Sequence, residues 1–229
     1  MLNNTEGIVF SAVKFKESSI IVKIFTSAYG MQSYIVHGAR SQRSKGKIAL
    51  YQPLSLLDMV VYYKEDKDIH KISESKFAQT YSDIPFDPVK RTIGIFITEI
   101  FGKVLRDEGE NKVLFEFLFN SLQIFDRLKE NASNFHLQLL LKATHHLGFG
   151  PASANDFIFQ LSESGFHLSI SQEEKKAIDA LMSSNYGDTI SMSLQFRRDV
   201  LDHIIKYYRV NTGNLREIKS LSILKVIFE

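Results

Sequence analysis

Four cations crowd into one eight-residue segment in the first third of the chain. They are Arg40, Arg43, Lys45 and Lys47, and a fifth cation, Lys23, precedes them. All five lie in a run of 40 residues, 18–57, that contains neither aspartate nor glutamate. Guanidinium and ammonium groups bind phosphate, and the missing carboxylates leave these cations without local partners. The segment therefore predicts a surface that holds a phosphate backbone by charge, although charge runs are often solvated loops with no partner.

The sequence lacks the motifs of the common classes of enzyme. Ser44-Lys45-Gly46-Lys47 only superficially resembles a nucleotide-binding P-loop, because the preceding glycine is absent. The sequence has no Gly-x-Gly-x-x-Gly and no Gly-x-Ser-x-Gly. It also has no cysteine, which excludes a cysteine nucleophile, disulfides and cysteine-ligated zinc. We therefore expect no enzyme and no cofactor.

Histidines offer the one candidate for a metal site. His145 and His146 are adjacent, so on a helix they point about 100° apart, whereas the zinc helix motif has histidines four residues apart. His203 lies near Asp199 and Asp202 on a later helix, where a solvated polar face is the simpler interpretation. We expect no metal.

The basic character belongs to the first third of the chain. The net charge is +2, but residues 1–80 hold 11 Lys/Arg against 7 Asp/Glu, and residues 81–229 hold 17 against 19. The N-terminus has no basic region followed by an apolar run, and no apolar stretch reaches the roughly 18 residues of a membrane span. With the absence of cysteine, this pattern favours a cytoplasmic protein.

A second, weaker basic cluster lies near the C-terminus. It is either an ordinary charged helix surface or a binding site for DNA or a protein partner. We single out four of its residues as a possible second basic patch: Arg197, Arg198, Lys206 and Arg209. The cluster continues with Arg216, Lys219 and Lys225.

The first 78 residues predict five short strands with turns between them. The ranges are 7–15, 19–26, 31–36, 54–63 and 69–77, rich in β-branched and aromatic residues. Five such strands without an intervening helix favour a five-stranded OB-fold barrel, with another small barrel or a half-sandwich as the alternative. Aromatic residues near the basic loop offer stacking surfaces for bases, but we expect most to be core and at most two to stack: Phe15, Phe25, Tyr29, Tyr34 and Tyr51.

The chain changes to a helical period after residue 80. Asp87 caps a helix that begins with Pro88, and Ser171 with Glu174 forms a capping box. The residues 156–169 are expected to form a short β-hairpin inserted among the helices. We therefore predict an α+β chain, with an OB-fold over 1–80 and an all-helical domain over 81–229. The predicted helices cover 89–106, 113–128, 135–147, 171–182, 194–208 and 218–228.

The ordered set of motifs resembles the RecO recombination mediators of bacteria. The matching segments are Thr5-x-Gly7-Ile8-Val9, Glu17 to Thr26, Gly30, Val36-His37-Gly38-Ala39-Arg40-Ser41, Leu50-x-x-Pro53-Leu54, Tyr207-Tyr208 and Leu215 to Leu221. No single motif is strict, but the similarity spans nearly the whole chain in order.

The resemblance implies a DNA repair and homologous recombination mediator. It implies binding of single- and double-stranded DNA, annealing of complementary strands, and partnership with RecR and the tail of the single-strand-binding protein to load RecA. From the charge of the basic loop itself, we assign phosphate contacts of the DNA to Arg40, Arg43, Lys45 and Lys47, with Lys23 as a secondary candidate. Many members carry a four-cysteine zinc module that this chain lacks. Packing of Phe157, Phe159, Leu161 and Phe166 is expected to replace it.

Two rival functions remain open at this point. One is a generic single-stranded RNA- or DNA-binding OB protein outside recombination. The other is a nuclease, which would need clustered carboxylates for a metal on a basic face that has none. Relative affinity for RNA and DNA separates the first rival, and a metal-dependent cleavage assay separates the second.

Overall fold

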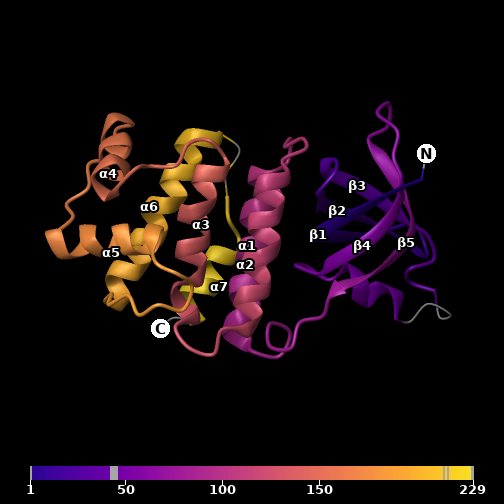
Figure 1. The fold of residues 1–229 in the computed structure, drawn as a ribbon, viewed down its shortest axis with the longest axis horizontal. Helices are drawn as coiled ribbons and strands as arrows, with labels where there is room; N and C mark the ends of the chain where they lie inside the picture. Colours follow the sequence, from indigo (N-terminus) through magenta and orange to yellow (C-terminus); the bar gives the residue numbers. More distant parts are fainter. Residues whose placement is uncertain (1, 42–45, 214, 216, 228–229) are drawn as a thin grey trace. The chain divides into compact units, whose positions relative to one another are not determined.

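The computed structural model describes residues 2–41, 46–213, 215 and 217–227 (Figure 1). The chain forms two compact units. The first comprises Met1–Ser82 with Gly94–Gln123, and the second comprises Asp83–Ile93 with Ile124–Glu229. The strands end before the first helix begins, close to the boundary expected between residues 80 and 81, but part of the helical sequence packs with the strands. That boundary stays a prediction.

Five strands close into a barrel in the first unit. They are β1 (Leu2–Phe15), β2 (Ser19–Thr26), β3 (Gly30–Val36), β4 (Leu56–Tyr62) and β5 (Ile69–Gln79). The order around the barrel is β1-β2-β3-β5-β4, antiparallel throughout except for the parallel pair β3–β5. Strand β1 pairs with two strands: with β4 along its first half and with β2 along its second half. This closed five-stranded barrel confirms the predicted OB-fold.

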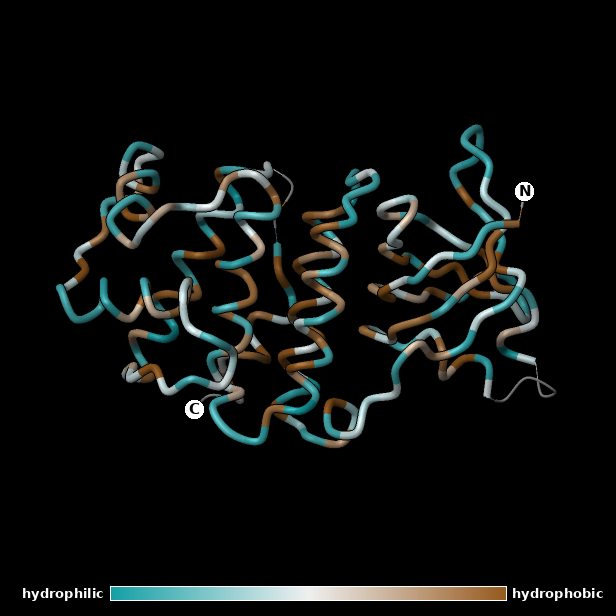
Figure 2. The backbone as a smooth tube through the Cα atoms, in the orientation of Figure 1, coloured by the Kyte–Doolittle hydropathy of each residue, from teal (hydrophilic) through white to brown (hydrophobic). Residues whose placement is uncertain are grey.

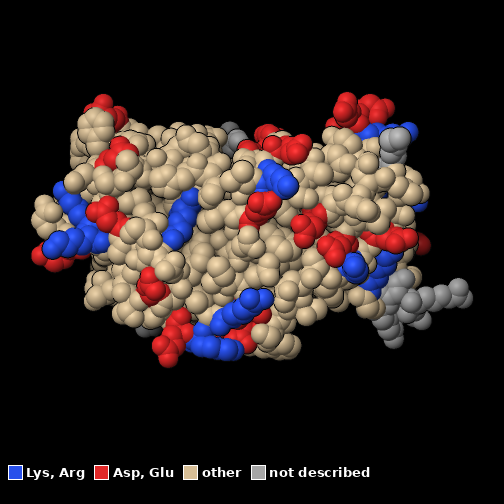
Figure 3. Space-filling model, viewed as in Figure 1, with Lys and Arg blue, Asp and Glu red and all other residues tan. Residues whose placement is uncertain are grey.

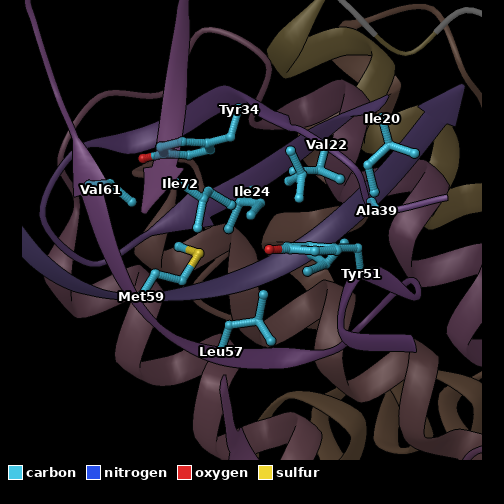
Figure 4. Packing of buried hydrophobic residues seen from close by; sticks show 12 residues of the cluster. Ile20, Val22, Ile24, Tyr34, Ala39, Tyr51, Leu57, Met59, Val61 and Ile72 are labelled. Carbon is cyan, nitrogen blue, oxygen red and sulfur yellow. The ribbon is translucent and has the colours of Figure 1, made fainter. Parts of the chain in front are cut away.

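The barrel interior is filled by alternate residues of the strands. Ile20, Val22 and Ile24 point inward from β2, as the two-residue period requires (Figure 4). Ile20 and Ala39 lie at one side of this core, and Tyr34 and Val61 lie at the other. The barrel therefore has two distinct ends.

We name these ends by the loops that form them. The β1–β2 end contains the turn 16–18 and the described residues 37–41 and 46–55 between β3 and β4, which include the short helix η2 (Lys47–Tyr51). The β4–β5 end contains the turn 27–29 and the loop 63–68. The registers Phe15↔Ser19 and Leu2↔Tyr62 fix which loops share an end.

Helices α1 (Pro88–Val104) and α2 (Lys112–Arg127) complete the first unit with their residues 94–123. Hydrophobic residues recur on successive turns of both helices (Figure 2). The fully buried ring of Phe25 points outward from β2 and contacts Phe115 of α2, with 6.0 Å between ring centroids. The N–H of Met31 donates a 3.0 Å hydrogen bond to the carbonyl of Glu108 in the α1–α2 turn. The helices thus cover part of the outer face of the barrel.

The second unit consists of helices and their connecting loops, with no strand among its described residues. It contains η3 (Ala132–Asn134), α3 (Phe135–His146), α4 (Ala154–Glu163), α5 (Gln172–Ser183), α6 (Leu194–Thr212) and α7 (Ser220–Ile227). The capping box predicted for Ser171 and Glu174 is present at the start of α5. None of the helices in the described ranges is both long and apolar enough to cross a membrane.

The predicted β-hairpin over 156–169 is wrong, because most of this segment is helix α4. Ser153 caps the helix by accepting a 3.2 Å hydrogen bond from the N–H of Asp156. Phe157 and Leu161, four residues apart, form a buried helical face, whereas Phe159 is 62% exposed. Only two of the four residues expected to replace the zinc module are therefore buried, since Phe166 is also exposed.

Candidate nucleic-acid interface

Arg40 is fixed at the β1–β2 end by backbone contacts. Ala39 before it is buried in the barrel core, and the N–H of Arg40 donates a 3.0 Å hydrogen bond to the carbonyl of Ser18. The Arg40 guanidinium is exposed and donates through Nη1 to the carbonyl of Glu17 at 3.2 Å. This bond uses one of five N–H donors, so the group keeps its charge and most of its donors for a ligand.

Lys47 is exposed as the first residue of η2 in the same connecting segment. The other end of η2 is anchored, because Tyr51 is buried and its hydroxyl lies 2.7 Å from the hydroxyl of Ser75 in β5. Arg43 and Lys45 lie outside the described residues, and their assignment to DNA stays a prediction.

Lys23 lies apart from the basic loop. It points outward from β2 opposite Ser11 and lines a pocket of about 370 Å³ with Glu99 of α1. The Glu99 carboxylate is paired with Lys103 at 2.8 Å. The structure therefore does not bring Lys23 together with Arg40 and Lys47, and its role in DNA binding remains a prediction.

Two lysines that the sequence reasoning missed lie at the β1–β2 end. Lys14 is exposed near the end of β1, opposite Ile20. Lys16 is exposed in the turn at a φ of 53°, with its ammonium 5.5 Å from the centroid of the Phe15 ring. Both precede the acid-free run, so only the hairpin register, which brings Phe15 opposite Ser19, could have associated them with the basic loop.

The exposed cations at the β1–β2 end are not neutralised within the described residues. The ion pairs among the described residues involve other lysines, and none of them involves Lys14, Lys16, Arg40 or Lys47. One acidic residue, Glu17, lies in the turn itself, and its carbonyl rather than its carboxylate contacts Arg40. The four exposed cations outnumber the one carboxylate of the turn, so a net positive field faces solvent here.

Carboxylates gather elsewhere on the barrel. The β4–β5 loop carries Glu65, Asp66 and Asp68, and the tip of this loop is red at the top of Figure 3. Glu6 and Asp58 line a groove of about 660 Å³ on the outer face. Partial burial, followed by the charges of Asp58 and Glu116, raises the pKa of Glu6. These surfaces repel a polyanion.

Most of the candidate stacking residues are core, as expected. Phe25, Tyr34 and Tyr51 are fully buried. Tyr29 is half-buried at the β4–β5 end and is stacked on Tyr63, with 3.9 Å between centroids. Phe15 is half-buried at the β1–β2 end, beside the lysines.

Several side chains of the possible second patch make contacts within the helical unit. The Nε of Arg197 donates to Asn134 at 2.8 Å, and the Nε of Arg209 donates to the carbonyl of Leu215 at 3.0 Å. The Lys206 ammonium lies 5.5 Å from the Phe166 ring centroid. The assignment of this patch stays a prediction. The fourth member of the patch, Arg198, is half-buried. In the rest of the basic cluster, Lys219 is exposed, and Arg216 and the side chain of Lys225 lie outside the described part.

No group of three or more histidines, aspartates and glutamates in the described ranges could hold a metal ion. His145 is exposed, and burial, with the charge of His145, lowers the pKa of the neighbouring His146.

The fold and the basic end define a class of protein: a closed OB-fold barrel with an exposed basic end, followed in the chain by a helical unit. Residues 1–81 match the family model "Recombination protein O N terminal", and residues 85–221 match "Recombination protein O C terminal". The chain therefore belongs to the RecO family of DNA repair and recombination proteins, which are not enzymes.

Full-length relatives agree with the family models. The chain is 36% identical to the DNA repair protein RecO of Flavobacterium psychrophilum over an alignment that covers 98% of each chain. It is 31% identical to the DNA repair protein RecO of Bacteroides fragilis over 100% of each chain.

Proposed function

We propose that this chain binds single- and double-stranded DNA, anneals complementary strands and helps to load RecA onto strands coated by the single-strand-binding protein. The observation that carries the proposal is the set of exposed cations without ion pairs at the β1–β2 end of the barrel. Family membership supports the same function. We place this activity in the bacterial cytoplasm, where chromosomal DNA is repaired.

Annealing is first an electrostatic problem, because two polyanions repel each other. Cationic side chains that contact phosphates lower this repulsion without any covalent step. Such contacts position a strand and do not read its sequence, which suits a protein that acts on any damaged site. If four loop cations contact a single strand, the logarithm of affinity falls with the logarithm of salt concentration at a slope of roughly −3.

The DNA assignment is tested by replacing Arg40, Arg43, Lys45 and Lys47 together by alanine. Folding should be retained, because the two described members of this set are exposed. Binding to a labelled single-stranded oligonucleotide should weaken at least tenfold at low salt. Unchanged affinity contradicts the assignment. A higher affinity for RNA than for DNA of equal length would favour a generic RNA-binding protein instead.

Annealing itself is measured with complementary oligonucleotides coated by the cognate single-strand-binding protein, without added nucleotide. The wild-type chain should accelerate duplex formation, and the fourfold variant should not. Equal acceleration by both proteins would show that annealing does not depend on the four loop cations.

For the tail of the single-strand-binding protein, we propose a receptor at Lys206 and Phe166 in the helical unit. An acidic tail that ends in hydrophobic residues needs a cation beside an exposed apolar surface, and this pair offers both, because Phe166 is 36% exposed. Lys206→Gln or Phe166→Ala should weaken binding of a fluorescent tail peptide at least tenfold. Lys64→Gln, at an exposed lysine of the barrel unit, removes the same charge and is the control. RecR is a further proposed partner, and RecA an indirect one.

A further inference from the structure

The outer face of β2 and β3 is poorly suited to carry nucleic acid in this barrel. OB-folds commonly bind oligonucleotides on this face, between the β1–β2 and β4–β5 loops. Here its aromatic residue, Phe25, is fully buried against Phe115 of α2, so no ring is left for a base to stack on. The outward residues of β3 at the paired positions are Met31, Ser33 and Ile35, none of which is a cation.

The one cation on that face, Lys23, shares a pocket with a carboxylate. Lys23 lines its pocket together with Glu99, whose carboxylate lies on α1. A phosphate that approached Lys23 would meet this carboxylate, although Lys103 partly neutralises it at 2.8 Å. The outer face therefore lacks both of the features by which single strands are held, stacking rings and a continuous cationic groove.

The two ends of the barrel differ in charge. The β4–β5 loop has three carboxylates, Glu65, Asp66 and Asp68, against Lys64 and Lys67. The α1–α2 turn adds Glu108, whose carbonyl binds Met31, to the same end. A strand running from one end of the barrel to the other would pass from a positive field into a negative one.

The β1–β2 end has the opposite character. Lys14 and Lys16 are exposed on the β1–β2 hairpin. Arg40 donates two hydrogen bonds to this hairpin, to the carbonyls of the turn residues Glu17 and Ser18. The backbone positions that carry Lys14, Lys16 and Arg40 are thereby fixed relative to one another before a ligand binds. Preorganisation lowers the entropic cost of binding a phosphate backbone.

We propose that nucleic acid crosses the β1–β2 end of the barrel, contacting Lys14 and Lys16 in addition to Arg40 and Lys47, and does not follow the outer face of β2 and β3 to the β4–β5 loop. This inference rests on the proposed DNA-binding function and adds the location of the strand and two contact residues.

The test compares two double variants with the same change in charge. Lys14→Gln/Lys16→Gln removes two cations from the β1–β2 end, and Lys64→Gln/Lys67→Gln removes two from the β4–β5 end. Because the net charge changes equally, long-range attraction falls equally, and the difference reports the location. Far-UV circular dichroism and thermal unfolding confirm that both variants are folded.

Affinity for a labelled 30-nucleotide single strand is measured by fluorescence anisotropy at several salt concentrations. The first variant should lose at least fivefold in affinity at low salt, and its salt slope should shrink by about 1.4, because each lost phosphate contact with a single strand removes about 0.7. The second variant should change less than twofold. Equal losses, or a larger loss in the second variant, would overturn the proposal. Failure of the wild-type chain to bind would instead refute the proposed function.

Lysine acetylation in the presence and absence of the oligonucleotide gives an independent readout by mass spectrometry. Lys14, Lys16 and Lys47 should be protected by the bound strand. Lys64 and Lys67 should be acetylated equally with and without it. Protection of the second group without the first would place the strand on the other end and overturn the proposal.

Discussion

Lys90 donates a 3.1 Å hydrogen bond to the carboxylate of Asp83, although only 3% of the Lys90 side chain is exposed. The same ammonium donates to the carbonyl of Asp126 at 2.8 Å. The carboxylate of Asp126 in turn accepts hydrogen bonds of 2.9 Å from the N–H groups of Asp83 and Ile84. This network fixes the segment before α1 within the helical unit, and the exposed Lys129 adds a 2.8 Å contact to Asp83 from outside.

The network predicts an order of destabilisation. Asp83→Ala should be the most damaging change, because it leaves the buried Lys90 ammonium without its carboxylate. Lys90→Met should cost about 1–3 kcal/mol, since the carbonyl of Asp126 loses its donor while the volume is kept. Lys129→Ala should have the smallest effect, because that pair is exposed. Urea denaturation of the three variants measures the order, and a larger loss for Lys129→Ala than for Asp83→Ala would contradict it.

A second prediction concerns acid stability and His136. The imidazole is fully buried, and burial, with the charge of Arg197, lowers its pKa to about 3. As the pH falls below about 6.5, the unfolded chain binds a proton at this histidine and the folded chain does not, so stability is lost between about pH 6.5 and 3.

The change His136→Leu should remove that component. Between pH 7 and pH 5 the wild-type chain should lose about 2 kcal/mol more unfolding free energy than the variant does. Urea titrations at the two pH values measure the difference. The comparison holds even if the variant is less stable at pH 7, because only the pH dependence is compared. Parallel acid losses in both proteins would show that His136 is protonated in the fold.

Two glycines with the same backbone conformation make a matched pair. Gly30 and Gly38 have φ values of 65° and 67°, which cost a residue with a Cβ about 1–2 kcal/mol. A Cβ on Gly30 would also collide with the carbonyl of Gly109 in the α1–α2 turn, whereas a Cβ on Gly38 would meet open space. Gly30→Ala should therefore destabilise the chain clearly more than Gly38→Ala in chemical denaturation. Equal effects would mean that the α1–α2 turn yields without cost.

The barrel was predictable because its strands are short, β-branched and separated by turns, so that the two-residue period is visible in the sequence. The same two-residue period led to the wrong prediction of a hairpin, because Phe157 and Phe159 alternate with other residues as in a strand. In the structure Phe157 and Leu161, four residues apart, lie on the buried face of a helix. Lys14 and Lys16 were missed because their relation to Arg40 depends on strand register, which is a property of pairing between segments.

The membership of residues 94–123 in the barrel unit was also not predictable. Both helices have ordinary amphipathic patterns, and nothing in them specifies that Phe115 meets Phe25 on the outside of β2. The consequence for function is substantial, because this contact is what removes the usual stacking surface of an OB-fold from the candidate site.

Phe15 is the remaining stacking candidate, since it is half-buried and lies beside Lys16 at the β1–β2 end. Stacking of one base on an aromatic ring is worth about 1–3 kcal/mol, so Phe15→Leu should weaken binding of single-stranded DNA at least fivefold. Binding of duplex DNA should change little, because paired bases are not available to stack. Tyr29→Leu, at the β4–β5 end, is the control and should leave both affinities unchanged. Equal losses for single strands and duplexes in the Phe15 variant would instead indicate that Phe15 supports the positions of the neighbouring lysines.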